Sequence, residues 1–232
     1  IIFSMGEGRS ILRTLDIGGD KVLPEAGVAE ANPFLGYRGI RFSLGNPDLF
    51  KEQLRAMLRA GKDKELGILL PMVSSVDEFK AARAILNTAL SDLESEGVAY
   101  NTTPRLGAMV ELPSAVSAIN DLAREADFLS IGTNDLVMYL LAVDRTNDRV
   151  SQMYKHYHPA VLKSLESIVK TAERHDCPVS ICGDMASDLA MLAFLIGIGL
   201  RSFSVEPVQI PELKRAIAEL RSDRAAQTAH AM

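Results

Sequence analysis

Short apolar runs rich in β-forming residues alternate with longer helical patterns along this chain. The predicted strands are Ile11–Leu15, Gly67–Val73, Leu106–Glu111, Phe128–Ile131, Pro178–Cys182 and Arg201–Val205. The predicted helices are Pro47–Ala60, Ser75–Glu96, Pro113–Arg124, Pro159–His175, Ser187–Ile196 and Pro211–Ser222. Several strands are apolar almost throughout, which is typical of parallel strands covered on both faces. The order strand, helix, strand, helix therefore predicts a parallel α/β architecture.

The chain is long enough to bury a substantial core, with 232 residues of which 47% are hydrophobic. No internal repeat or low-complexity linker interrupts it, so residues 1–232 are predicted to form one domain. The terminal Ala225–Met232, within a tail at about residues 223–232, is predicted to fray. Asp16–Asn46 lacks clear periodicity, and loops beyond roughly 15 residues are uncommon unless they have a function. Because the chain opens on Ile1, we interpret it as a piece of a longer polypeptide.

Charge and cysteine content exclude several classes of protein. The net charge is −5 and no run of five like charges occurs, which argues against a nucleic-acid surface. The two cysteines form neither a CxxC motif nor a disulfide framework, so a reducing cytoplasm is expected. The longest apolar run, Leu189–Leu200, is shorter than the roughly 20 residues that span a bilayer, and no signal peptide is present. We therefore expect a cytoplasmic protein with neither a nucleic-acid nor a membrane partner.

Two carboxylates stand where consecutive predicted strands end. Glu111 closes the strand Leu106–Glu111, and Asp135 follows the strand Phe128–Ile131. Catalytic groups gather at the carboxyl ends of strands in parallel α/β sheets and barrels. Mg²⁺ accepts one or two carboxylates and takes its other ligands from water and substrate phosphate, so the pair can hold this ion. For either residue alone a helix cap is an equally good interpretation, but two carboxylates on consecutive strands favour a metal.

Three arginines are placed to bind an anionic ligand. Arg13 lies within an otherwise apolar strand, and Arg38 follows an aromatic residue in the long loop. Arg145 follows Asp144. A buried charge is costly without a partner, and guanidinium groups bind phosphate and carboxylate oxygens through paired hydrogen bonds. A structural ion pair is the alternative for each arginine, and Asp144 is an available partner for Arg145.

Asn134 and Cys182 are two further candidates. The Asn134 amide can donate to a phosphate oxygen, or it can cap the helix that begins at Asp135, and in isolation the cap is favoured. Cys182 ends the strand Pro178–Cys182 and precedes a glycine. A lone cysteine is more often a small buried hydrophobe than a reactive group, which is our interpretation of Cys177. The position of Cys182 at a strand end makes it the better functional candidate.

With these residues in line, the chain resembles the C-terminal phosphoenolpyruvate-binding domain of Enzyme I, the phosphoenolpyruvate–protein phosphotransferase of bacterial sugar and nitrogen phosphotransferase systems. The strings that carry the resemblance are RTLDIGGDK (13–21), NPFLGYR (32–38), QLRAMLRA (53–60), LPM (70–72), MVELP (109–113), SIGTNDL (130–136), AVDR (142–145) and CG (182–183). They cover nearly the whole chain in family order. The strings PSAV (113–116) and HPAVL (158–162) are more similar to the nitrogen-related branch.

The resemblance implies a TIM (β/α)8 barrel of the phosphoenolpyruvate/pyruvate type that is dimeric and Mg²⁺-dependent. The implied metal ligands are Glu111 and Asp135, the implied substrate-binding residues are Arg13, Arg38, Asn134 and Arg145, and the implied proton donor is Cys182. Mg²⁺ and arginines would neutralise the phosphoryl group during transfer. The enolpyruvate leaving group would then be protonated at carbon to give pyruvate. The implied partners are an N-terminal histidine domain, a phosphocarrier protein and a second copy of the chain.

Departures from the family pattern bear on these expectations. The family's barrel has two strands before the one that matches Ile11–Leu15, so an incomplete barrel of about six of the eight βα units is expected here. Tyr37 replaces a tryptophan, Met138 a glutamine and Asp184 a glutamate. The phosphoryl-accepting histidine belongs to the N-terminal domain, and none of the four histidines of this chain has its sequence context.

The leading hypothesis is an enzyme, the catalytic domain of a phosphoenolpyruvate:protein-histidine phosphotransferase. It would pass the phosphoryl group to a histidine on a separate domain and release pyruvate, as the first step of a bacterial phosphotransferase system. This chain alone is expected not to turn over, because its acceptor histidine is absent. Pyruvate phosphate dikinase and phosphoenolpyruvate synthase, which share the barrel, are one alternative. A non-catalytic phosphoenolpyruvate-sensing dimerisation module is another, because Leu189–Leu200 is apolar and barrel strands are missing.

Overall fold

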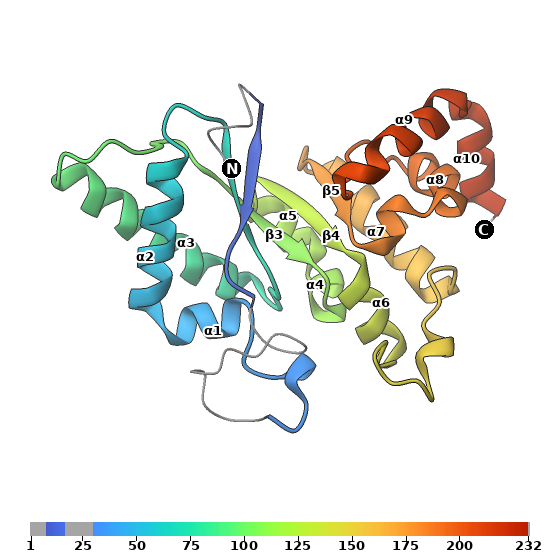
Figure 1. The fold of residues 1–232 in the computed structure, drawn as a ribbon, viewed down its shortest axis with the longest axis horizontal. Helices are drawn as coiled ribbons and strands as arrows, with labels where there is room; N and C mark the ends of the chain where they lie inside the picture. The colour runs from blue at the N-terminus through green and yellow to red at the C-terminus, as the bar shows by residue number, and fades with distance from the viewer. Residues whose placement is uncertain (1–7, 17–29, 232) are drawn as a thin grey trace. The chain divides into compact units, whose positions relative to one another are not determined.

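The computed structural model of the chain describes residues 8–16 and 30–231. The chain divides into two compact units, Ile1–Met109 and Val110–Met232, which we describe separately (Figure 1). Residues 17–21 of the RTLDIGGDK string and residues 17–29 of the long connection lie outside the described residues. The expectation of a single domain over residues 1–232 stays a prediction.

The first unit is built on three parallel strands, β1 (Ser10–Arg13), β2 (Leu66–Leu70) and β3 (Arg105–Val110). Ile11 pairs with Gly67, and Gly67 pairs in turn with Arg105, so β2 is the middle strand. Every residue of β2 is buried. This continuous burial explains why the strand reads as an unbroken apolar run rather than an alternating one.

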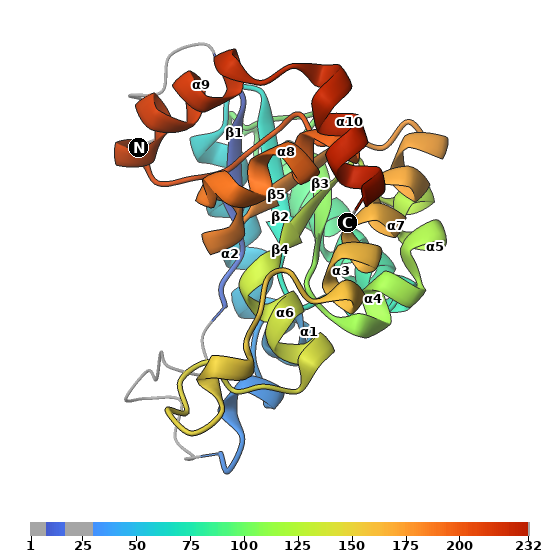
Figure 2. The same cartoon turned by 90° about the vertical axis from the view of Figure 1, so that its right-hand side faces the viewer.

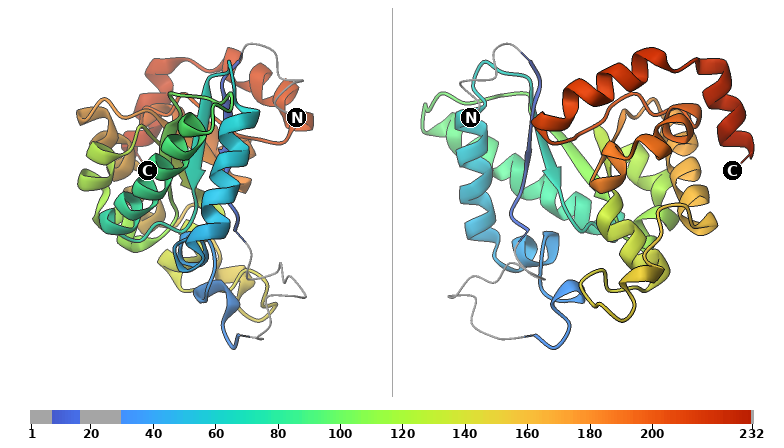
Figure 3. Two further views of the ribbon diagram at one scale, coloured as in Figure 1. Left: turned by 90° about the vertical axis from the view of Figure 1, so that its left-hand side faces the viewer. Right: turned by 45° about the vertical axis from the view of Figure 1, so that its right-hand side comes forward.

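Helices connect these strands. They are a short 3₁₀ turn η2 (Pro33–Leu35), α1 (Ile40–Gly45), α2 (Pro47–Ala60) and α3 (Val76–Ser95). Helix α2 begins at a proline, whose missing N–H is tolerated in the first turn. Phe50, Leu54 and Leu58 recur every four residues and form its buried stripe. Helices α2 and α3 pack against each other, as Figures 1 and 3 show.

The second unit holds β4 (Phe128–Gly132) and β5 (Val179–Cys182), which pair in parallel from Leu129–Val179 to Gly132–Cys182. Its helices are α4 (Pro113–Ser117), α5 (Ile119–Glu125), α6 (Thr133–Leu141), α7 (Pro159–Arg174), α8 (Leu189–Gly197), α9 (Ile210–Glu219) and α10 (Ser222–Ala231). Short 3₁₀ turns η3 (Ser151–Met153), η4 (Asp184–Ser187) and η5 (Pro207–Gln209) join them. Helix α5 packs on α7, and α8 packs on α10 (Figure 2).

Two expectations are corrected. The sixth predicted strand, Arg201–Val205, is an isolated bridge between Phe203 and Ile181. Ile181 N donates to the Ser202 carbonyl oxygen and Ser204 N donates to the Ile181 carbonyl oxygen, but the chain then turns into η5, so no ladder develops. The tail is helical rather than frayed, because alanine is the best helix former and its small side chain allows Ala225 and Ala229 to approach α8 closely at Gly197.

The parallel α/β class is confirmed. Parallel strands alternate with helices as in a (β/α)8 barrel, and the described residues contain five strands rather than eight, so the barrel is incomplete. One predicted helix, Pro113–Arg124, is divided into α4 and α5 at Ala118. Within the part of the chain that the structure describes, no helix combines the length and apolar character needed to cross a bilayer.

Candidate functional site

Glu111 and Asp135 are placed by two similar strand-to-helix turns in the second unit. Glu111 directly follows β3 and stands just before α4, whereas Asp135 lies in the first turn of α6, directly after β4. Helices α4 and α6 pack against each other. The two residues are only 3% and 7% exposed. Burying a carboxylate is expensive unless its charge is compensated, so two at successive strand ends indicate a polar site.

The chemistry of these donors fits a hard divalent cation. Among the described residues, no group of three or more His, Cys, Asp or Glu side chains could enclose a metal. A cation at Glu111 and Asp135 would therefore depend on water and on a bound ligand for its remaining oxygens. Mg²⁺ tolerates such a site, because it is commonly held by one or two carboxylates plus substrate phosphates.

Asn134 is tied to the end of β5. Its Oδ1 accepts a hydrogen bond of 2.9 Å from the Asp184 N–H, which leaves the side-chain NH₂ as the donor. The N-cap of α6 is Gly132, so the alternative interpretation of Asn134 as the cap of that helix is not what the structure shows. The Cβ that Gly183 lacks would lie 2.6 Å from Asn134 Oδ1. The turn after β5 therefore fits around the Asn134 side chain and fixes its orientation.

Cys182 lies partly buried at the end of β5. Its thiol donates to the Ile131 carbonyl oxygen at 3.4 Å and accepts from Ser130 Oγ at 3.8 Å. Thr133 Oγ1 donates to the Cys182 carbonyl oxygen at 2.7 Å. The sulfur is thus held between β4 and β5. Cys177 is buried and donates to the Ala126 carbonyl oxygen at 3.5 Å, as expected of a structural cysteine.

Arg145 lies half-buried in the turn after α6. Within the described residues it forms no ion pair, and the expected partner Asp144 instead accepts two hydrogen bonds from Thr146, at 2.7 Å from Oγ1 and 2.8 Å from N. These bonds, first from the Thr146 hydroxyl and then from its main chain, lower the pKa of Asp144, and the charge of Arg145 adds a smaller effect. The local ion-pair alternative for Arg145 is therefore not what the structure shows.

Arg13 and Arg38 lie in the first unit and share one acidic partner, Asp16. Arg38 donates from Nε and Nη2 to the two Asp16 carboxylate oxygens, at 3.0 and 2.8 Å. Arg13 Nη1 lies 3.6 Å from Asp16 Oδ2. Sequence reasoning missed Asp16, because an aspartate three residues beyond an arginine is unremarkable until the structure places Arg38 beside it.

Tyr154 is a second residue that sequence reasoning missed. Its hydroxyl donates to the Asn134 carbonyl oxygen at 3.1 Å, and its ring meets His156 edge-on at a centroid distance of 5.5 Å. Burial raises the pKa of Tyr154 to about 12, and the charges of Asp184 and Asp135 act in the same direction against that of Arg145. An aromatic residue in a long loop was the sole local signal.

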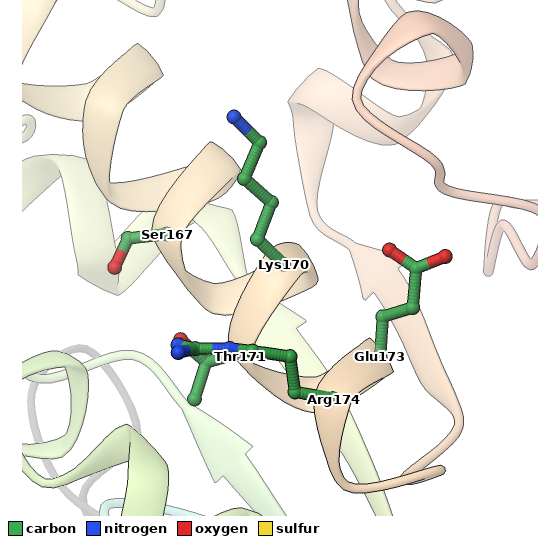
Figure 4. Close-up of a pocket in the computed structure, with 5 residues that line it drawn as sticks. All are labelled: Ser167, Lys170, Thr171, Glu173 and Arg174. Atoms are coloured by element: carbon green, nitrogen blue, oxygen red, sulfur yellow. The ribbon is translucent and has the colours of Figure 1, made fainter.

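A shallow hollow of about 440 Å³ lies on α7, lined by Ser167, Lys170, Thr171, Glu173 and Arg174. Figure 4 shows Lys170 extended away from Arg174, whose guanidinium lies beside Thr171. Lys170 pairs with Glu166, and Arg174 donates to Thr171 Oγ1. The Lys170, Thr171 and Arg174 side chains are therefore engaged within one helix, and the hollow contains none of the candidate residues.

Comparison with curated proteins finds close relatives. A phosphoenolpyruvate-protein phosphotransferase of Haloferax volcanii is 46% identical over 221 residues, which are 93% of this chain and 39% of that protein. One of Priestia megaterium is 44% identical, over 92% of this chain and 38% of its own length. A Salmonella typhimurium protein described as phosphoenolpyruvate-dependent phosphotransferase system is 46% identical, over 88% of this chain and 27% of its own. The chain thus spans about two fifths or less of the length of these relatives.

Among solved structures, a crystal structure of a citrate lyase from Burkholderia xenovorans is similar with a TM-score of 0.55 and 22% sequence identity. The likeness covers 78% of this chain and 60% of that chain, and at this identity it concerns the fold alone.

The family comparison covers almost the whole sequence. The family model for the PEP-binding domain of PEP-utilising enzymes, where PEP is phosphoenolpyruvate, matches residues 1–222. The match includes the first compact unit, the second unit as far as residue 222, and every candidate residue discussed above. This chain therefore belongs to the family of PEP-binding domains of PEP-utilising enzymes.

Proposed function

We propose that the chain is the catalytic PEP-binding domain of a PEP–protein phosphotransferase, which transfers the phosphoryl group of PEP to a histidine on a separate domain and releases pyruvate. The observation that carries the proposal is the buried carboxylate pair Glu111 and Asp135 in a chain 40–46% identical, over most of its length, to proteins of that name. The names of these relatives favour a protein phosphotransferase over a dikinase or a synthase.

Each candidate residue has the chemistry for one part of the reaction. Glu111 and Asp135 would hold Mg²⁺, which when bound would neutralise phosphoryl oxygens. The Asn134 NH₂ group, the guanidiniums of Arg13 and Arg145, and that of Arg38 would orient the phosphoryl and carboxylate oxygens of PEP. Positioning and charge neutralisation are what phosphoryl transfer demands most of a protein.

Cys182 supplies the proton that completes the reaction. The P–O bond of PEP breaks, its electron pair stays on the enolate oxygen, and the phosphoryl group bonds to the acceptor histidine nitrogen. The Cys182 thiol then donates its proton to the enolate carbon, which gives pyruvate and a thiolate that solvent reprotonates. Its position between β4 and β5, with Sγ 3.4 Å from the Ile131 oxygen, supports a fixed direction of proton delivery.

The wider setting is proposed on the same grounds. A phosphocarrier protein would receive the phosphoryl group, the protein would be a cytoplasmic homodimer, and the strings at residues 113–116 and 158–162 favour the nitrogen-related branch. The residues 1–232 would form one domain, with the acceptor histidine on another.

The test uses the full-length protein that contains this chain. PEP labelled at phosphorus is added with Mg²⁺, and label on the protein is measured together with pyruvate release. We expect both, and we expect Glu111→Gln to slow transfer about 100-fold, or roughly 2.7 kcal/mol of barrier. Glu94→Gln, on the exposed surface of α3, is the matched control and should leave the rate unchanged. Absence of transfer by the folded wild-type protein, or an unaffected Glu111→Gln variant, would contradict the proposal.

A further inference from the structure

One buried carboxylate in the first unit contacts Arg13 and Arg38, the two candidate anion-binding arginines of that unit. The Asp16 side chain is 4% exposed. It receives two hydrogen bonds from Arg38, at 2.8 and 3.0 Å, and Arg13 Nη1 lies 3.6 Å from its Oδ2 atom. Asp16 comes only three residues after Arg13 but 22 residues before Arg38, so the fold brings the three together.

The two contacts differ in kind. The Arg38 pair is bidentate, which fixes the plane of the guanidinium as well as its distance, and the Arg38 side chain is 8% exposed. The distance from Arg13 to Asp16 is longer than a hydrogen bond, and the Arg13 side chain is 43% exposed. Arg38 is thus held in one orientation, whereas Arg13 is tethered loosely and can turn towards another anion.

Asp16 is itself held on a rigid frame. Thr14 N donates to the Leu69 carbonyl oxygen at 3.0 Å, and Leu15 N donates to Gln53 Oε1 at 3.2 Å. On the other side, Gly39 follows Arg38 with a φ of +56°, and Ile40 N donates to the Pro71 carbonyl oxygen at 3.1 Å. The segment before Asp16 is therefore anchored to β2 and α2, and the segment after Arg38 is anchored to Pro71, just beyond β2.

We infer that Asp16 is a positioning residue for the reaction, an inference that rests on the proposed function. It keeps the Arg38 guanidinium in a fixed plane before and after PEP binds. It holds Arg13 by charge alone until an oxygen of the ligand takes its place. A carboxylate that served only to neutralise buried Arg38 would have no need of this geometry, and a carboxylate of the same charge slightly displaced would serve as well.

Two substitutions separate these roles in the full-length protein, with kcat and KM for PEP as readouts. Asp16→Asn turns one oxygen into an NH₂ group that opposes the Arg38 donors, and kcat should fall about 100-fold because the guanidinium is misplaced. KM should change less than about threefold, because Arg13 remains available. Asp16→Glu keeps the charge but moves it by one methylene, and kcat should still fall at least about tenfold. A pure charge neutraliser predicts near-normal kcat for the glutamate variant.

Asp92→Asn is the matched control. Asp92 is also a carboxylate shared by two cations, with Lys51 Nζ at 3.0 Å and Arg55 Nη1 at 4.0 Å, but it lies on the surface of the helix pair α2 and α3. It should keep wild-type kcat and KM. A wild-type protein that does not turn over PEP would overturn the proposed function. An active wild type with unchanged Asp16 variants, or with equal losses in Asp92→Asn, would overturn only the inference about Asp16.

A measurement on the unaltered protein decides the matter if the Asp16 variants do not fold. Arginine Nε–H resonances are followed by NMR with and without PEP and Mg²⁺, and are assigned with Arg13→Lys and Arg38→Lys. The Arg38 Nε–H should be protected from exchange in both states, and Arg13 should become protected only with PEP. Loss of Arg38 protection on binding, or no change at Arg13, would refute the inference.

Discussion

Gly183 follows Cys182 in a backbone conformation that side chains rarely adopt, with a φ of +91°. A Cβ at this position would also press on Thr133 Oγ1 and lie 2.6 Å from Asn134 Oδ1. Gly183→Ala should therefore destabilise the protein by about 1–3 kcal/mol. It should also displace the Asn134 amide and reduce phosphoryl transfer at least about tenfold. Urea unfolding and the transfer assay measure the two effects.

Gly97→Ala provides the comparison for that prediction. Gly97 has a similar φ of +66°, but nothing lies within 4 Å of the Cβ it would gain. The substitution should cost about 1–2 kcal/mol of backbone strain and leave activity intact. If both variants lost activity alike, the contact between Gly183 and Asn134 would not be the cause.

Tyr154 should make the free energy of unfolding depend on pH in the alkaline range. Its pKa is raised to about 12 in the folded protein, first by burial, against about 10 in an unfolded chain. The folded state therefore keeps this proton between about pH 10 and 12 while the unfolded state loses it. The stability that Tyr154 contributes is fully present below pH 10 and is lost as the pH rises through about 12.

The change Tyr154→Phe removes that titration together with the hydrogen bond to Asn134. The free energy of unfolding of the wild-type protein should fall more steeply than that of the variant when the pH is raised above 10. Denaturant unfolding at pH 8 and at several values above 10 measures the difference. Parallel curves for the two proteins would show that Tyr154 titrates normally.

The N-termini of several helices could be predicted from the sequence. Proline at Pro47, Pro113 and Pro159 begins α2, α4 and α7, and a capping box begins α3. Such signals are local, because they depend on side chains within one turn of the main-chain groups they satisfy. The division of the helix at Ala118 carried no such signal, since alanine favours helix.

The capping box of α3 gives a prediction about stability. Ser75 Oγ accepts from the Glu78 N–H at 3.3 Å, and the Glu78 carboxylate accepts in return from the Ser75 N–H. Ser75→Ala leaves an N-terminal donor of the helix unsatisfied and should lower the free energy of unfolding by about 1 kcal/mol. Thr88→Ala, on the exposed side of the same helix, should have no such effect. Equal losses in the two variants would show that the cap is not the origin.

At the scale of the whole molecule, ligand binding should raise the melting temperature. A ligand that binds only the folded protein at 100 times its dissociation constant adds roughly 2.7 kcal/mol. For a chain of this length, that corresponds to a rise in melting temperature of roughly 5–10 °C. PEP with Mg²⁺ should produce this rise in the wild-type protein. Asp135→Asn should show little rise, and a rise as large as the wild type's would argue against Asp135 as a metal ligand.

The amino-acid sequence sufficed to identify the parallel α/β class, most element positions and the family, because these depend on local periodicity, strand-end motifs and resemblance. It also named Glu111 and Asp135 at successive strand ends, where the structure buries both. Their roles stay predictions.

Contacts between residues far apart along the chain had to come from the fold. Arg38 donates to Asp16, which lies 22 residues earlier, and Tyr154 donates to Asn134, which lies 20 residues earlier. The alanines near the C-terminus pack against α8. Such partners leave no periodic trace, because a side chain's local sequence fixes its element and facing direction but not what the rest of the chain brings against it. The resemblance could name the arginines, whereas their shared carboxylate emerged from packing.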